Sequence, residues 1–176
     1  MDNETILTEF DPNEFIDWGH ELVEAIVNDI RSSGIGAYIT GKIARNLLLG
    51  KKRVFDHAQI TVIGSDKTVI LTVRRALAIR GFKRIGEIYN KPFELIADEW
   101  VYEDDRFQLF LFVNYNRLED GLRIPANPTP LFIREDIMDV FALIYEAYGE
   151  LVKGKGDINE LAQDIKELIK LQAMFG

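Results

Sequence analysis

One stretch of the chain, from Ala37 to Val62, constrains the fold more than any other. It reads AYITGKIARNLLLGKKRVFDHAQITV, with glycines at Gly41 and Gly50. β-Branched and aromatic residues favour strands, and glycine favours turns and helix ends. The stretch therefore predicts a strand, a glycine turn, a short helix, a basic loop and a second strand.

The composition is that of a globular protein. The 176 residues fit one domain, and 47% of them are hydrophobic. There is no cysteine, which excludes disulfides and thiolate zinc sites and suits a reducing cytoplasm. The acidic N-terminus is not a signal peptide, and no run of ~18 apolar residues is long enough to span a membrane. We therefore expect a soluble, cytoplasmic protein.

The net charge restricts the partners. It is −8, with a pI near 4.9. Proteins that grip nucleic acid through phosphates usually carry a basic surface, so extended nucleic-acid binding is disfavoured. A basic protein partner or a small ligand fits better, although Lys51, Lys52 and Arg53 form a local basic patch.

The order of elements predicts an α/β (α+β) fold. Helices are expected at about 12–32, 41–49, 67–80, 134–152 and 158–174, and strands at 37–40, 59–63, 93–97, 100–102 and 107–113. An acidic turn at 103–105 joins the last two strands. This pattern predicts one domain over 1–176, with a mixed-sheet core at about 12–114 and a C-terminal helical part at about 131–176.

These elements and their residues resemble the nucleotidyltransferase superfamily, and more closely its small bacterial branch related to abortive-infection toxins of the AbiE type. The matching residues are Thr40-Gly41-Lys42, the helix to Leu49, Gly50, Arg53, the strand from His57, and the segments IREDI at 133–137 and KGDI at 155–158. The resemblance implies a mixed β-sheet flanked by helices. It also implies a site that uses magnesium and a nucleoside triphosphate.

The resemblance places the family's Asp-x-Asp motif on His57 and Gln59, and a third acid on Gln108. Nucleotidyl transfer uses metal ions that bridge the phosphates, and magnesium prefers carboxylate ligands. Alternate strand residues point to one face, so Asp-x-Asp sets two carboxylates side by side. None of the three positions here carries a negative charge. Loss of the ancestral reaction is therefore expected, with no cofactor.

Four further residues are candidates near this site. By resemblance, Gly41, Lys42 and Arg53 lie close to the phosphates; Lys42 could equally fill the pocket or lie in solvent. Asp56 precedes the expected acid position by one residue, which turns it to the opposite strand face. It is either a substitute carboxylate or a solvated loop acid.

Three functions remain open. The favoured one is a bacterial pseudoenzyme with a degenerate active site that acts as a binding or regulatory protein, in a defence setting that the resemblance suggests. The second is an active transferase with relocated carboxylates, Asp56 with Asp104 or Asp105. The third is a purely structural or dimerisation module that forms a homodimer.

Overall fold

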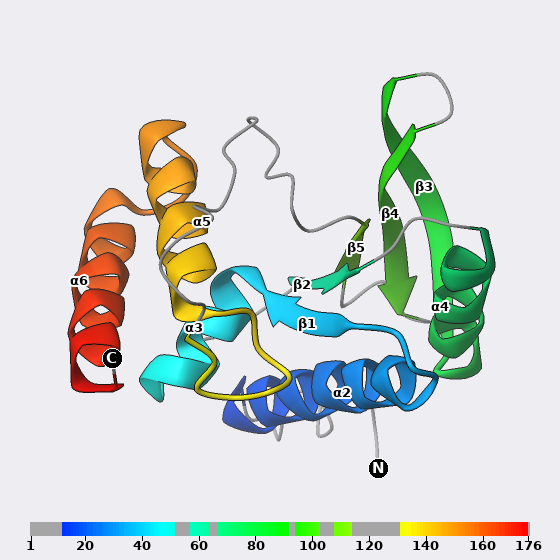
Figure 1. The fold of residues 1–176 in the computed structure, drawn as a ribbon, viewed down its shortest axis with the longest axis horizontal. Helices are drawn as coiled ribbons and strands as arrows, with labels where there is room; N and C mark the ends of the chain where they lie inside the picture. Colours follow the sequence, from blue (N-terminus) through cyan, green and yellow to red (C-terminus); the bar gives the residue numbers. More distant parts are fainter. Residues whose placement is uncertain are drawn as a thin grey trace, which may run out of the picture.

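The computed structural model describes residues 12–51, 57–63, 67–91, 94–102, 108–113 and 131–175 of the chain. Figure 1 shows the elements along the chain: α2 (Pro12–Ser32), β1 (Ala37–Thr40), α3 (Gly41–Leu49), β2 (His57–Val62), α4 (Lys67–Ile79), β3 (Phe82–Lys91), β4 (Glu94–Tyr102), β5 (Gln108–Val113), α5 (Val140–Val152) and α6 (Ile158–Phe175). None of these helices is both long and apolar enough to cross a membrane, as far as the described residues show.

The described strands form one mixed sheet in the order β1-β2-β5-β4-β3. Strands β2 and β5 run parallel, whereas β1 with β2, β5 with β4, and β4 with β3 run antiparallel. The parallel pair β2 and β5 lies at the centre of the sheet. The prediction of a mixed sheet flanked by helices is confirmed.

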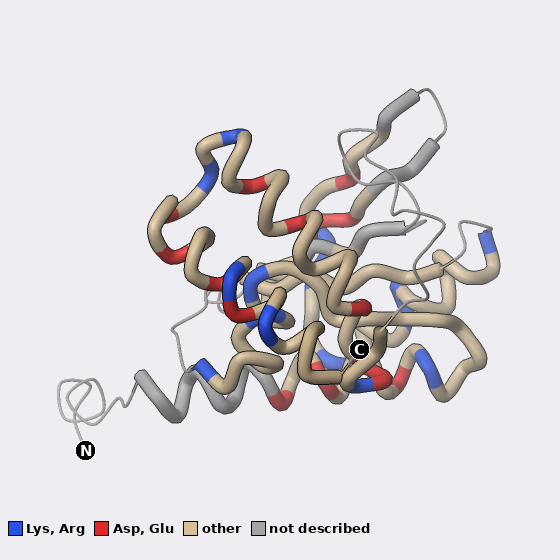
Figure 2. The backbone as a smooth tube through the Cα atoms, turned by 60° about the vertical axis from the view of Figure 1, so that its left-hand side comes forward, with Lys and Arg blue, Asp and Glu red and all other residues tan. Residues whose placement is uncertain are grey.

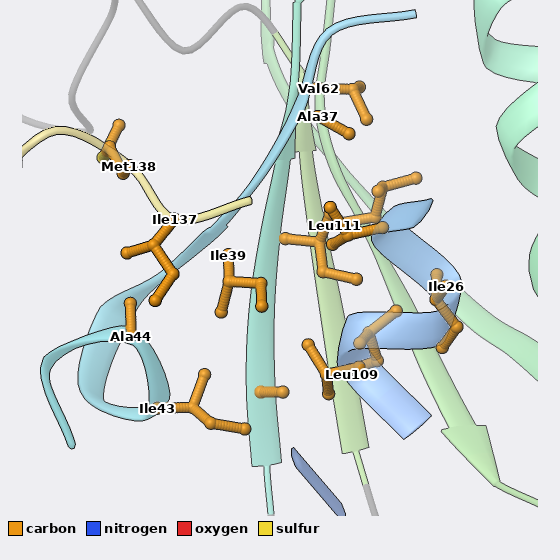
Figure 3. Close-up of a cluster of buried hydrophobic side chains, with 14 of the residues drawn as sticks. Ile26, Ala37, Ile39, Ile43, Ala44, Val62, Leu109, Leu111, Ile137 and Met138 are labelled. Atoms are coloured by element: carbon orange, nitrogen blue, oxygen red, sulfur yellow. The ribbon is translucent and has the colours of Figure 1, made fainter. Parts of the chain in front are cut away.

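The hydrophobic core lies between the sheet and helix α2. Figure 3 shows Ile39 of β1 and Leu109 and Leu111 of β5 together with Ile26 of α2. All four side chains are fully or almost fully buried. Because strand side chains alternate between faces, this arrangement commits one face of β1, β2 and β5 to the core and leaves the other face for a site.

The segment before α5 runs along the outer edge of β1. Ile39 N–H donates to the Asp136 carbonyl at 2.7 Å, and Met138 N–H donates to the Ile39 carbonyl at 3.0 Å. Helix α5 begins only at Val140, where the Asp139 carboxylate accepts from Ala142 N–H at 3.0 Å. The predicted helix start at residue 134 was therefore wrong, because residues 135–136 form a turn and Ile137 then bridges to Ile39 of β1.

Two separate strands were predicted at 93–97 and 100–102. This division was wrong, because β4 runs through both as one strand. Polar Asp98 and Glu99 interrupt the apolar pattern there, but Asp98 is buried and accepts two hydrogen bonds of 2.8 Å from Arg74 of α4. Strand β2 begins at His57, two residues before the predicted start. The predicted turn at 103–105 lies outside the described residues.

The cap of α5 gives the first testable prediction. Substituting a capping aspartate with alanine typically costs about 1 kcal/mol. Asp139→Ala should therefore lower the free energy of unfolding by about 1–2 kcal/mol in urea denaturation. Asp139→Asn keeps the side-chain acceptor and removes a carboxylate whose pKa burial raises, so it should lose less than half as much. Equal stability of the alanine variant and the wild type would contradict this role.

Candidate functional site

Side chains along β2 alternate between the core and the opposite face of the sheet, which we call the site face. Ala58 and Ile60 are buried in the core, so His57 and Gln59 lie on the opposite face, where both are half-buried. The parallel register pairs residue Gln108 of β5 with His57. The three positions to which the resemblance assigned carboxylates therefore lie beside one another on one face of the sheet.

The glycine turn meets this face at the start of α3. Gly41 has a φ of 75°, a conformation that favours glycine. A Cβ at this position would stand 2.5 Å from Gln59 Oε1, so a larger residue would have to displace the Gln59 side chain as well as adopt a strained positive φ. The Gln59 amide thus lies directly over the turn that the resemblance assigns to phosphate binding.

Two acidic side chains from the C-terminal helices contact the same turn. Gly41 N–H donates to Glu146 Oε1 of α5 at 2.5 Å. Lys42 Nζ forms an ion pair with Glu160 Oε1 of α6 at 3.3 Å. The backbone donor and the lysine that were predicted to contact a ligand are therefore each bound to a carboxylate of this chain.

A buried arginine lies behind the turn. Arg45 of α3 is 1% exposed and forms ion pairs with Glu150 at 3.0 Å, Asp164 at 3.7 Å and Glu146 at 3.8 Å. Figure 2 shows acidic and basic positions close together in this part of the molecule. Because the three carboxylates come from α5 and α6, this arginine joins both C-terminal helices to α3.

A second cation extends the network. Lys51 Nζ lies 2.8 Å from Asp164 Oδ1 and 2.5 Å from Glu167 Oε2. Burial alone would lower the pKa of Lys51, but hydrogen bonds to these two carboxylates raise it overall. Lys51 is therefore a structural contact of α6, not only part of the basic patch predicted with residues 52 and 53.

Glu146 is the ionisable group that this environment perturbs most. Burial raises its pKa from 4.5 to about 7, and the nearby Glu150 carboxylate adds to the rise. The Arg45 guanidinium and the Gly41 N–H act in the opposite direction. Near neutral pH the carboxyl that contacts the glycine turn is thus close to its midpoint of ionisation.

Glu99 is the one acid of β4 whose register position shares the site face. Glu99 pairs with Phe110 of β5, and Phe110 pairs with Gln59 of β2. Strand β5 therefore lies between Glu99 and β2, at a spacing of about 5 Å on each side. Glu99 Oε2 lies 3.1 Å from the place of a Cβ on Gly86, so the carboxylate leans toward β3 and away from β2. Within the described parts of the chain, no three His, Cys, Asp or Glu residues are grouped to hold a metal ion.

Four of the predicted site residues, Arg53, Asp56, Asp104 and Asp105, lie outside the described residues. Conversely, Arg45 and Glu146 were not predicted from the sequence. One signal was present: Glu146 and Glu150 are acids spaced by four residues in an otherwise apolar α5, which places both on one helix face.

No protein-family model matches the chain, and no curated protein matches it. The solved structures that are similar in fold include three nucleotidyltransferase-related ones. The crystal structure of ANT(2")-Ia in complex with adenylyl-2"-tobramycin has a TM-score of 0.56 and 14% identity, and covers 89% of this chain and 96% of that chain. The solution structure of the antibiotic-resistance factor ANT(2'')-Ia has a TM-score of 0.56 and 13% identity, with 91% and 94% covered.

The third structure is an antigenic nucleotidyltransferase-like protein from Paracoccidioides brasiliensis. It has a TM-score of 0.54 and 19% identity, and covers 86% of this chain and 75% of that chain. At 13–19% identity, these structures show that the chain shares their fold. This chain therefore has the nucleotidyltransferase fold, as its sequence motifs predicted.

The arginine network gives the second prediction. Removing one partner of a buried ion pair leaves uncompensated charge and costs about 3–5 kcal/mol. Arg45→Ala should lower the free energy of unfolding by up to that amount, because Asp164 is 1% exposed and loses this ion pair while keeping that with Lys51. The matched control is Arg80→Ala, which breaks a solvent-exposed pair with Asp29 and should lower the free energy of unfolding far less. Urea denaturation, monitored by the fluorescence of buried Trp100, measures both free energies of unfolding. Equal losses of stability in Arg45→Ala and Arg80→Ala would refute the role of the network.

The raised pKa of Glu146 gives the third prediction. Between pH 4.5 and about 7 the folded protein holds a proton that the unfolded chain has released. This contribution to stability is complete below pH 4.5 and is lost as the pH rises to about 7. Glu146→Gln lacks the dependence, so the wild type should lose about 1–3 kcal/mol relative to it over this window. Parallel stability curves for the two proteins would show that the pKa of Glu146 is not raised.

Proposed function

We propose that this protein is a nucleotidyltransferase-fold pseudoenzyme that does not catalyse metal-dependent nucleotidyl transfer and acts as a binding or regulatory protein. The observation that carries the proposal is the absence of charge at three adjacent positions. His57, Gln59 and Gln108 stand where the resemblance places the metal-binding carboxylates, and the strand register sets them side by side.

These residues do not fit the magnesium ions that the fold family implies. Magnesium is a hard cation that is bound mainly through carboxylates and phosphates. An imidazole and two amides offer no negative charge to balance metal ions beside a triphosphate. Glu99, the acid of β4 on the same face, leans toward β3 and does not supply the missing charge to β2.

The state of the glycine turn also supports the proposal. An incoming phosphate would meet the Gln59 amide over Gly41 and would have to displace Glu146 from the Gly41 N–H. It would also compete with Glu160 for Lys42. Each ionised carboxylate repels a phosphate at this distance, so the turn disfavours nucleotides in this state.

The partner that we propose is a basic protein segment or a small ligand. The net charge of −8 favours positively charged partners over nucleic acid. We further propose the AbiE-related branch on the sequence motifs given above, and with it a cytoplasmic role in bacterial defence. The ligand in the ANT(2")-Ia structure belongs to that protein, and the fold likeness alone does not transfer it to this chain.

The fourth prediction concerns catalysis. The purified chain, incubated with magnesium, radiolabelled nucleoside triphosphates and extracts of protein and RNA as acceptors, should transfer no label. The matched variant combines His57→Asp, Gln59→Asp and Gln108→Asp. It restores three carboxylates and should acquire a magnesium-dependent increase in melting temperature with ATP that the wild type lacks.

Label transfer by the wild-type chain would overturn the proposal. If label transfer then disappeared in Asp56→Asn, Asp104→Asn or Asp105→Asn, the relocated carboxylates would be identified as the catalytic groups. A wild-type chain that shows the same magnesium-dependent stabilisation as the triple variant would equally contradict the argument from charge.

A further inference from the structure

Basic residues are concentrated in one continuous stretch of this acidic chain. Residues 67–91, which include α4 and β3, contain seven Lys and Arg residues and a single acid, Glu87. This stretch therefore has a formal charge of +6, and because the whole chain has −8, the remaining residues together have −14. A region whose charge is opposite to that of the rest of the molecule attracts partners that the rest repels.

Three of these cations keep their charge exposed to solvent. In the described part of the chain, Lys67, Arg75 and Lys83 form no ion pair, and all three residues are exposed. By contrast, Arg84 is paired with Glu87 on the same strand. The surface formed by α4 and β3 therefore carries positive charge that is available to a partner.

Ion pairs also fix how α4 is turned against the sheet. Arg74 donates two hydrogen bonds of 2.8 Å to Asp98 of β4, so this flank of α4 faces the part of the sheet that β4 and β3 form. The other flank pairs with α2 through Arg80. Residues three or seven positions apart share one flank of a helix, so Lys67 and Leu71 lie on the same flank as Arg74. Figure 1 shows α4 beside β3.

Strand β3 forms one edge of the described sheet. It pairs with β4 on one side, and among the described strands none pairs with its other side. The edge of a sheet presents backbone N–H and C=O groups that can pair with an added strand. Ile85, Ile88 and Tyr89 are exposed along β3, and Leu71 is 52% exposed on the neighbouring flank of α4. This edge thus offers backbone pairing next to apolar side chains and exposed cations.

We propose that the edge of β3 and the neighbouring flank of α4, together called the basic edge, bind an acidic extended segment of a partner protein. The segment adds to the sheet as a further strand through backbone hydrogen bonds to β3. Its carboxylates lie near Lys67, Arg75 and Lys83, and its apolar side chains contact Leu71 and Ile85. The net charge of −8 favours basic partners elsewhere on the molecule, whereas the basic edge favours an acidic one.

The basic edge is separate from the site described above. It includes neither the glycine turn nor the three uncharged strand positions at 57, 59 and 108. The inference therefore goes beyond the proposed function and does not depend on the proposed loss of catalysis.

Charge complementarity selects an acidic segment over a second copy of this chain. Two copies that paired β3 with β3 would bring their exposed cations together, and like charges repel. Shifts in register between Arg84 and Gly86 and after Ile88 also interrupt β3, and such bulges hinder continuous pairing between two long strands. A short segment of opposite charge avoids both obstacles.

The apolar side chains select a protein segment over nucleic acid. Single-stranded RNA matches the positive charge, but it is bound largely by stacking of its bases on aromatic side chains. The exposed side chains here are mainly aliphatic: Leu71, Ile79 and Ile85 are all more than half exposed. An acidic segment with apolar residues matches both the charge and the apolar surface.

The fifth prediction uses a fluorescein-labelled octapeptide that alternates glutamate and valine, titrated into the full-length chain and followed by fluorescence anisotropy. This octapeptide should bind saturably, whereas an alternating lysine and valine octapeptide should not bind. Two further forms carry N-methyl groups on alternate amides, in the two possible phases. The form that blocks the amides facing β3 should bind about tenfold or more weakly, because it cannot donate to the strand.

Paired charge reversals locate the binding surface. Arg75→Glu combined with Lys83→Glu should weaken binding of the acidic octapeptide about tenfold or more. The matched control, Lys166→Glu combined with Lys170→Glu, makes the same change in net charge at exposed positions of α6, which lies at the opposite end of the molecule from α4 (Figure 1). Physiological salt screens charges beyond about 8 Å, so the control should change the affinity less than about twofold.

Each of several results would overturn the proposal. Lack of saturable octapeptide binding by the wild type would refute the site, and equal affinities of the parent and both N-methylated forms would refute strand addition. Equal losses in the two double variants would show that binding is not localised at the basic edge. Tighter binding of a single-stranded RNA dodecamer, lost in the Arg75→Glu and Lys83→Glu variant, would assign the surface to nucleic acid. These titrations contain neither nucleoside triphosphate nor metal, so their failure is distinct from a failure of the proposed function.

Discussion

The ion pairs of Arg45 are the contact on which the C-terminal half of this structure depends. A fully buried guanidinium costs several kcal/mol in lost hydration unless carboxylates and hydrogen bonds surround it. Here Glu146, Glu150 and Asp164 supply that charge from α5 and α6. Helix α3 therefore needs the two C-terminal helices to bury its arginine, and those helices need α3 to neutralise their acids.

The same network determines the chemistry of the glycine turn. Because Glu146 is drawn in by Arg45, its carboxylate also lies on the Gly41 N–H. The Gly41 N–H at the start of α3 is thus satisfied by the chain itself, next to strand positions that carry no acid. Fold and activity are separable in this way, because a scaffold can persist after its charged groups are replaced.

The sequence predicts the helices and strands whose ends are set by local signals. It fails where contacts between residues far apart in the chain set the boundary of an element. Strand β1 and helix α3 were predicted within a residue, because Gly41 and Gly50 mark the ends of α3. The start of α5 was misplaced, because residues 136–138 pair with the backbone of Ile39. The pairing of Arg45 with Glu146 joins residues about a hundred positions apart, and no local pattern in a single sequence predicts such a contact.

The central claim is that the site lacks the charge to hold magnesium and a triphosphate together. Isothermal titration calorimetry of ATP into the wild-type chain, with and without magnesium, tests it most directly. The account predicts that magnesium leaves the isotherm unchanged. Saturable ATP binding that appears only with magnesium, at micromolar affinity, would contradict it.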